Sequence, residues 1–428
     1  MPGSRTAAFR IRAFTTLMVA AALVASVGLS MAGVLTAATP LDQPGTGEAA
    51  SAHSTRSNTM RGDTVPDDAV RSRQWPLHML RLRDAWQYAT GGNVIVGVLD
   101  SGVDASHPDL SGQVLAGADF VDPGDGRTDT VGHGTTVAAL IAGRDDSTGV
   151  VGVAHHARIL PVRVLDRKNR YRDAETVAKG LRWAVDHGAR VVNLSLGGSL
   201  RSTQLAEAIQ YAYDHDVVVV ACGGNKSHDD QVWYPAREPG VVAVTGLGRD
   251  GLFWSGSLAG PDSSLSAPAT GIVGIGPSGY QTVRGTSFAA ALVSATAALI
   301  RSHWPDMSAA NVVNRLIRTA RDRGPAGRDD RYGFGVVDPV GALTNPVASV
   351  RENPLDTTPR SPNPSVSWSR SPVPGVAPDT EDGAAPWWWL LLGVLGAGGF
   401  TAAIGLAVRR HRRIRLSAPS LWDQPPRG

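Results

Sequence analysis

The sequence predicts an α/β fold, a parallel sheet with helices on both faces. Apolar, β-branched runs alternate with helix-like segments between residues 75 and 345, an order typical of this class. The runs lack the alternating polar residues of strands that face water on one side, which indicates burial on both faces. Apolar residues make up 42% of the 428 residues and Cys222 is the single cysteine, so a large core, not an internal disulfide, holds the fold together.

The strands and helices are expected in alternation along the chain. Apolar β-branched runs predict strands at 93–100, 157–165, 189–196, 217–225 and 241–247. Helical spacing of apolar residues predicts helices at 133–143, 173–188, 203–216 and 287–305. In open α/β sheets ligands bind outside the carboxyl ends of the strands, so polar residues at these ends are the candidates for function.

Both ends of the chain are predicted to lie outside this domain. Residues 1–38 combine a basic start with an uncharged apolar run, typical of a secretory signal peptide, with an uncleaved anchor as the alternative. Residues 39–74 form a small, polar N-terminal extension, and residues 346–386, with 9 of the 28 prolines, predict an extended linker. Residues 387–408 carry no charge and have the length of a transmembrane helix, and residues 409–428 form a basic tail.

These end segments predict a single-pass protein of the cell membrane. The arginine-rich tail is cytoplasmic by the positive-inside rule, which leaves the folded domain, residues 75–345, outside the cell. The formal net charge of +3 is concentrated in the two ends. No basic surface remains in the domain to indicate binding of nucleic acid.

Three polar residues stand at strand ends and helix starts. Asp100 ends the strand in "VLDSGVDASHPDL", His133 begins the helix in "GHGTTVAALIAG", and Ser287 begins the helix in "RGTSFAA". Each has a plainer interpretation, as a turn, a surface or capping residue and an N-cap respectively. A serine hydroxyl becomes a nucleophile when a histidine takes its proton, and the histidine needs a carboxylate on its other nitrogen. The three types together therefore indicate a catalytic triad.

The motifs around these residues resemble those of the subtilisin-like serine proteases, peptidase family S8. "DSG" with "HPDL", "GHGTTVA" and "GTSFAA" follow the order Asp, His, Ser, and the resemblance covers residues 75–345. It implies a subtilisin-like parallel sheet, a serine endopeptidase that acts on polypeptides, and catalytic roles for Asp100, His133 and Ser287.

The same resemblance implies how a substrate is held. Asn225 in "ACGGN" corresponds to an oxyanion donor, with a plain turn residue as the alternative. "SLGG" resembles an edge segment that pairs with an extended peptide by strand addition. The implied substrate-binding residues are Ser195, Leu196, Gly197, Gly198, Gly223 and Gly224.

Several other residues receive plainer interpretations. Cys222 is expected to be a small buried residue and not a second nucleophile, and His155 and His156 are expected in a surface loop and not at a metal. Trp183 and Trp233 are expected to pack or to lie at a rim, with Trp233 lining the cleft as the alternative.

One acidic loop has oxygen ligands of the kind that calcium prefers. It contains Asp119, Asp122, Asp125 and Asp129, but it lacks the pattern of an EF-hand. We therefore predict no metal site and no cofactor.

The order of segments resembles that of the mycosins, membrane-anchored subtilisin-like proteases associated with type VII secretion systems. This resemblance implies that the protein cleaves secreted proteins beside a type VII secretion membrane complex. A mainly structural subunit of that complex, and a tethered housekeeping protease without a secretion partner, are the alternatives. Residues 39–74 are too short and polar for a separately folded inhibitory pro-domain, so we expect them to lie on the protease or to stay loose, with Trp75, Leu77 and Leu80 docked after them.

Overall fold

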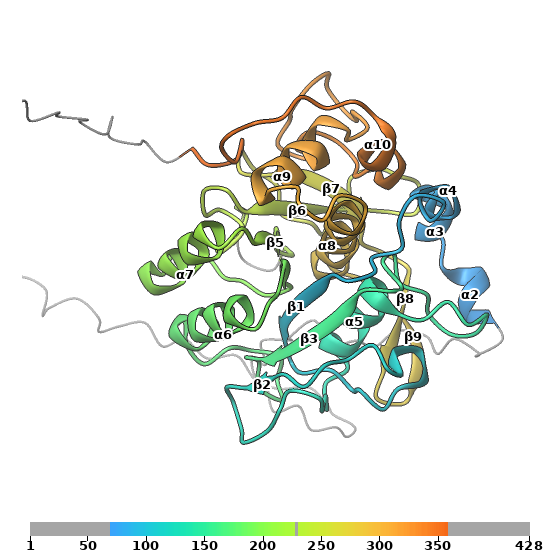
Figure 1. The fold of residues 1–428 in the computed structure, drawn as a ribbon, viewed down its shortest axis with the longest axis vertical. Helices are drawn as coiled ribbons and strands as arrows, with labels where there is room; N and C mark the ends of the chain where they lie inside the picture. Colours follow the sequence, from blue (N-terminus) through green and yellow to red (C-terminus); the bar gives the residue numbers. More distant parts are fainter. Residues whose placement is uncertain (1–68, 227–229, 358–428) are drawn as a thin grey trace, which may run out of the picture. The chain divides into compact units, whose positions relative to one another are not determined.

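The fold is that of a computed structural model, which describes residues 69–226 and 230–357. Seven parallel strands form one sheet in the order β2-β3-β1-β4-β5-β6-β7 (Figure 1). The predicted signal peptide at 1–38, transmembrane helix at 387–408 and basic tail at 409–428 lie outside the described residues, as does most of 39–74 and of 346–386.

The predicted strands are found at the predicted places. They are β1 (Ile95–Asp100), β3 (Arg158–Arg163), β4 (Val191–Leu194), β5 (Val218–Cys222) and β6 (Val242–Leu247), and β2 (Ala118–Asp119) and β7 (Leu265–Pro268) extend the sheet at its edges. A separate antiparallel hairpin consists of β8 (Ile272–Gly276) and β9 (Gly279–Val283). β2, β7 and the hairpin were not predicted from the sequence, because β2 has only two residues and the other three strands are short and interrupted by Gly, Ser or Pro.

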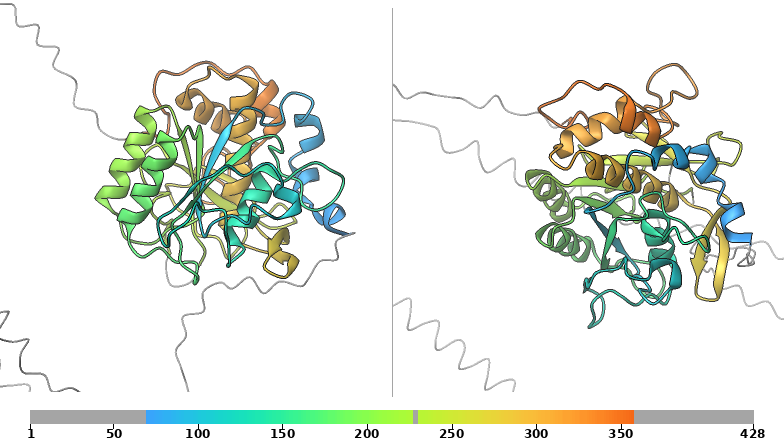
Figure 2. Two further views of the ribbon diagram at one scale, coloured as in Figure 1. Left: turned by 60° about the horizontal axis from the view of Figure 1, so that its bottom comes forward. Right: turned by 45° about the vertical axis from the view of Figure 1, so that its right-hand side comes forward.

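Helices cover both faces of the sheet, as predicted. α6 (Ala174–Asp186) and α7 (Thr203–Asp214) pack together on one face, and α5 (His133–Ala142) and α8 (Thr286–His303) pack on the other (Figure 2). The alternation of side chains along β5 shows why both faces are apolar. Val218, Val220 and Cys222 join the core around α5 and α8, whereas Val219 and Ala221 join the core around α6 and α7.

The described chain stays packed beyond the predicted limits of 75 and 345. Before residue 75, α2 (Val70–Arg73) buries Val70 completely, and the Gln74 amide both donates to and accepts from the backbone of Val151 at 3.0 Å. After residue 345, the Leu355 carbonyl oxygen accepts the Gly240 N–H at 2.8 Å.

Short helices complete the domain. They are α3 (Pro76–Met79), α4 (Leu82–Ala85), the 3₁₀ turn η2 (Pro108–Leu110), α9 (Ala309–Arg318) and α10 (Pro339–Thr344). The predicted docking of the segment after residue 74 is confirmed. The Trp75 indole N–H donates to Thr270 O and Gly271 O at 3.1 Å, Leu80 is buried, and Leu77 packs against the core. Across residues 69–226 and 230–357, no helix is both long and apolar enough to span a bilayer.

Candidate active site

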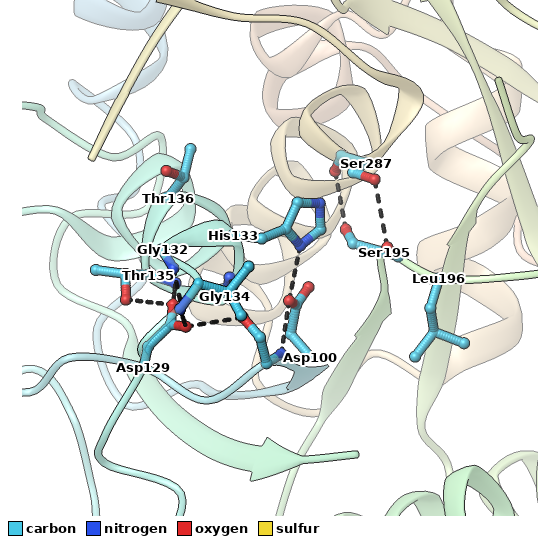
Figure 3. A network of polar contacts seen from close by, with 12 residues as sticks. Asp100, Asp129, Gly132, His133, Gly134, Thr135, Thr136, Ser195, Leu196 and Ser287 are labelled. Atoms are coloured by element: carbon cyan, nitrogen blue, oxygen red, sulfur yellow. Dashed lines mark hydrogen bonds and ion pairs between the residues drawn. The ribbon is translucent and has the colours of Figure 1, made fainter. Parts of the chain in front are cut away.

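The three candidate catalytic residues meet at the carboxyl edge of the sheet. Asp100 is the last residue of β1, His133 is the first residue of α5, and Ser287 is the second residue of α8. The imidazole ring of His133 lies between Asp100 and Ser287 (Figure 3). The structure therefore brings together three residues that are far apart in the sequence.

Asp100 and His133 are joined by a buried hydrogen bond. Nδ1 of His133 lies 2.7 Å from Oδ1 of Asp100, which also accepts the Ser101 N–H at 2.7 Å. Asp100 has no exposed surface and His133 is 7% exposed. Gly134 allows this approach, because a Cβ on it would overlap Gly102 O and lie 3.0 Å from Asp100 Cβ. Asp100 is thus placed to fix the orientation of the His133 ring.

Opposing effects act on the pKa of His133. Burial disfavours the charged imidazolium and lowers the pKa, but the charge and hydrogen bond of Asp100 and the charge of Asp129 raise it. The attractive effects win, so the pKa of His133 is above its ordinary value of 6.5. His133 is therefore a stronger base than a free histidine.

Asp129 holds the start of α5 in place. Its Oδ1 accepts the N–H groups of Val131 and Gly132 at 2.9 Å and the Ser101 hydroxyl at 3.0 Å. Its Oδ2 accepts the N–H of Thr135 at 3.0 Å and its hydroxyl at 2.7 Å (Figure 3). These five bonds join the first turn of α5 to the residue that follows Asp100.

Ser287 does not cap its helix. The N-cap of α8 is Gly285, whose φ of 153° is a conformation that side chains rarely adopt, and no side chain caps this helix. The N-cap interpretation of Ser287 is therefore wrong. The Ser287 hydroxyl instead donates to Ser195 O at 3.3 Å, and among the described residues it makes no hydrogen bond to His133. Rotation about χ1 would have to bring the hydroxyl from Ser195 to the imidazole.

Asn225 is oriented by the residue before Ser287. Its Oδ1 accepts the Thr286 N–H at 3.0 Å and the Thr286 hydroxyl at 3.2 Å. The Thr286 oxygen accepts the Gly224 N–H at 3.1 Å in turn. Because Oδ1 is fixed in this way, the amide Nδ2 is free to donate, and it donates to no described residue. A Cβ built on Gly285 would lie 3.6 Å from Nδ2, which places this donor beside the start of α8.

The segment of residues 195–198 follows β4 and is held by hydrogen bonds to Asn193, Ser287 and Tyr234. The Ser195 hydroxyl accepts from Asn193 Nδ2 at 2.8 Å and donates to Ser287 O at 2.9 Å. Gly198 N–H and C=O are bonded to Tyr234 O and N–H at 2.9 and 2.8 Å. The backbone groups of Gly197 form no hydrogen bond with a described residue, so Gly197 is one position of this segment that can pair with a peptide.

The two glycines after β5 have no free backbone groups. Gly223 donates to Val244 O and accepts from Trp233 N–H, at 2.8 and 2.9 Å. Gly224 donates to the Thr286 hydroxyl and accepts from Leu258 N–H at 3.0 Å. As substrate-binding residues, Gly223 and Gly224 can contribute only by leaving space, not by hydrogen bonds to a peptide.

The plainer interpretations have mixed outcomes. Cys222 is buried, as predicted, and burial raises its thiol pKa to about 12, so the thiol stays neutral. The surface-loop prediction is wrong for His155, which is 7% exposed because the Trp86 ring covers it at 4.8 Å between centroids. His156 next to it is exposed. The Trp183 ring stacks on the His187 ring, with 3.8 Å between the ring centroids.

The acidic loop does not gather its carboxylates at one point. Arg163 pairs with Asp119 at 2.8 Å and with Asp122 at 3.1 Å. Asp125 pairs with Arg127 at 2.6 Å, and Asp129 accepts hydrogen bonds from the first turn of α5. Within residues 69–226 and 230–357, no group of three or more His, Cys, Asp or Glu side chains is arranged to hold a metal ion.

Comparison with known proteins agrees with this geometry. The model of the subtilase family, peptidase S8, matches residues 91–335, and the chain belongs to this family. It is a subtilisin-like serine endopeptidase.

Within this family the chain is mycosin-like. It is 35% identical to mycosin-1 of Mycobacterium tuberculosis over 66% of this chain and 75% of that protein. It is also 35% identical to fervidolysin of Fervidobacterium pennivorans over 65% of this chain, but spans only 45% of that longer protein. The solved structure of MycP3, a protease from the type VII (ESX-3) secretion system, superposes with a TM-score of 0.60 at 33% identity, over 68% of this chain and 93% of the other.

The residues that support the site were not predicted from the sequence. Thr286 orients Asn225, and Asn193 orients Ser195. Asp129 was grouped with the acidic loop, although its position four residues before His133 is a signal that could have found it, because a helix start needs acceptors for its free N–H groups.

Proposed function

We propose that Asp100, His133 and Ser287 are the catalytic triad of this endopeptidase. The observation that carries the proposal is the buried 2.7 Å contact between His133 Nδ1 and Asp100 Oδ1 beside the start of α8. In the reaction Ser287 Oγ attacks the carbonyl carbon of a peptide bond, and its proton passes to His133 Nε2. Asp100 stabilises the resulting imidazolium.

The oxyanion is held by two donors in this proposal. They are Asn225 Nδ2 and the N–H of Ser287, which belongs to the first helical turn and has no partner within the helix. His133 then gives its proton to the leaving amine, which leaves an acyl group on Ser287. Water, deprotonated by His133, releases the acyl group as a carboxylic acid and returns the proton to Ser287. An extended peptide pairs with Gly197 during these steps.

The test is Ser287→Ala with a fluorophosphonate probe. We expect the wild-type protein to be labelled at Ser287, and we expect the variant to lose peptidase activity by about 10⁶ in kcat, the size known for the nucleophile of subtilisin. Its thermal unfolding should match that of the wild type. Labelling of the variant at the same peptide, or retained turnover, would refute the assignment.

We further propose that the protease is anchored in the cell membrane and acts beside a type VII secretion complex. Support comes from the uncharged segment 387–408 with its basic tail, and from the similarity to MycP3. External protease on intact cells should remove the catalytic domain and leave the tail. A reporter fused after Gly428 that is active only outside the cell would contradict this topology, and failure of the protein to co-purify with secretion membrane components would contradict the association.

A further inference from the structure

Two segments define the space next to Ser287. One is residues 195–198, after β4, and the other is residues 222–225, which begin with the last residue of β5. They are joined at their inner end, where Cys222 Sγ lies 3.6 Å from Leu196 O. At the end nearer to Ser287, the first segment presents Ser195 O, which lies 3.3 Å from the Ser287 hydroxyl, and the second segment presents Asn225. A side chain of a bound peptide that points inward from Ser287 must enter between these two segments.

The indole of Trp233 already lies between them. A Cβ built on Gly197 would be 3.1 Å from Trp233 Cβ and 3.4 Å from its Cε3. A Cβ built on Gly224 would be 2.6 Å from Trp233 Cδ2 and 2.8 Å from its Cγ. The ring is therefore in contact with the backbone of both segments, and it fits because both positions are glycine.

The backbone keeps the indole in this place. Trp233 N–H donates to Gly223 O at 2.9 Å, which attaches it to one segment. The next residue, Tyr234, makes two hydrogen bonds to Gly198, which attach it to the other segment. Moving the ring out of the space would require a rotation of its side chain against these two fixed walls.

We propose that Trp233 determines specificity by filling this space, so that the residue before the scissile bond must be small: Gly, Ala or Ser. This inference rests on the proposed roles of Ser287, Asn225 and Gly197. A peptide whose scissile carbonyl lies between Ser287 Oγ and Asn225 Nδ2 can donate the N–H of the same residue to Ser195 O. Its side chain then points between the two segments, where the indole leaves room for only a small group.

The experiment uses the full chain and two fluorogenic peptides that differ only in the residue before the scissile bond, Ala or Phe. We expect wild type to have a kcat/KM at least about 10²-fold higher for Ala than for Phe, the size of effect that a pocket wall produces. In Trp233→Gly we expect kcat/KM for Phe to rise at least about 10-fold. Equal or better cleavage of the Phe peptide by wild type would overturn the inference without any variant.

Two controls make the result specific. Trp183→Ala removes a tryptophan of α6 whose ring stacks on His187. This change should leave the ratio of kcat/KM for the Ala and Phe peptides unchanged. Fluorophosphonate labelling of Ser287 shows whether each protein is folded and active, and if Trp233→Gly is not labelled, Trp233→Leu replaces it with the same expected direction. Absent labelling of wild type would refute the proposed triad, whereas normal labelling without discrimination between the peptides would refute only the role of Trp233.

Discussion

Asp129→Asn separates two roles of one carboxylate, in folding and in tuning His133. The replacement keeps the shape of the side chain but removes its charge. One oxygen can still accept from Ser101, Val131 and Gly132. The new amide group then faces the N–H of Thr135, so a donor meets a donor where Oδ2 had accepted at 3.0 Å.

The expected loss of stability follows from these contacts. A helix N–H left without an acceptor costs about 1–3 kcal/mol. The lost negative charge at the start of α5 costs about 0.3–1 kcal/mol more. We therefore expect the free energy of unfolding to fall by about 1–4 kcal/mol, and Tm by roughly 2–7 °C for a domain of this size.

The same change must also move the pH profile. The charge of Asp129 contributes to raising the pKa of His133, so its removal lowers that pKa. His133 must be neutral to take the proton of Ser287, so activity is lost as pH falls through this pKa. The acid limb of kcat/KM therefore moves to lower pH in Asp129→Asn.

The assay is kcat/KM for a small peptide across pH at constant ionic strength, with thermal unfolding of the same samples. Asp125→Asn is the matched control, because Asp125 belongs to the same loop but pairs with Arg127 at the surface. It should change stability by less than about 0.5 kcal/mol and leave the acid limb in place. If Asp129→Asn lowers Tm but its acid limb stays at the wild-type pH or moves upward, Asp129 has only a structural role and the electrostatic reasoning is refuted.

Three further predictions test other parts of the site. If Asn225 is the proposed oxyanion donor, Asn225→Ala should lower kcat about 10²–10³-fold, the size measured for such a donor in subtilisin, with little change in KM. Steady-state kinetics would show a purely structural role if KM rose instead. Cys222 should resist iodoacetamide in the native protein and react after unfolding, because its thiol is buried and neutral, and rapid native alkylation would contradict this. A chain that begins at Asp68 should match the full chain in activity and stability. A chain that begins at Gln74 should keep its activity but lose about 1.5–3 kcal/mol of stability, because the buried side chain of Val70 is removed. A large rise in activity on either truncation would reveal an inhibitory pro-domain.

The central sheet was predictable because its strands are buried on both faces. Runs such as Val217–Val220 show this burial directly in their composition, and helices that pack on them show a regular apolar spacing. Edge elements are different, because their short segments combine apolar residues with Ser, Gly and Pro. β7 contains Ser266 and Pro268, and its place beside β6 follows only from the three-dimensional arrangement.

The residues of the proposed triad were also predictable, but the contacts that support them were not. Asp100, His133 and Ser287 each stand in a local motif, so the sequence marks them one by one. The role of Trp233 depends on Gly197 and Gly224, which come from two different loops. No local sequence pattern indicates that these three residues meet. The same limit applies to Asp129, because only the structure shows the five hydrogen bonds that distinguish it from the other aspartates of the acidic loop.

The N-terminal segment is connected to His133, the proposed catalytic base, through the β8–β9 hairpin. Trp75 holds the residues just before β8, with its indole N–H on Thr270 O and Gly271 O. Within β8, Ile275 makes two hydrogen bonds to the Thr136 hydroxyl, at 2.7 and 2.9 Å, and Thr136 lies in the first turn of α5 with His133. Because each contact braces the next, the segment that begins at Gln74 supports the geometry of the active site. These contacts all start at Trp75 and therefore remain in a chain that begins at Gln74. For this reason we expect removal of the residues before Gln74 to affect stability more than catalysis.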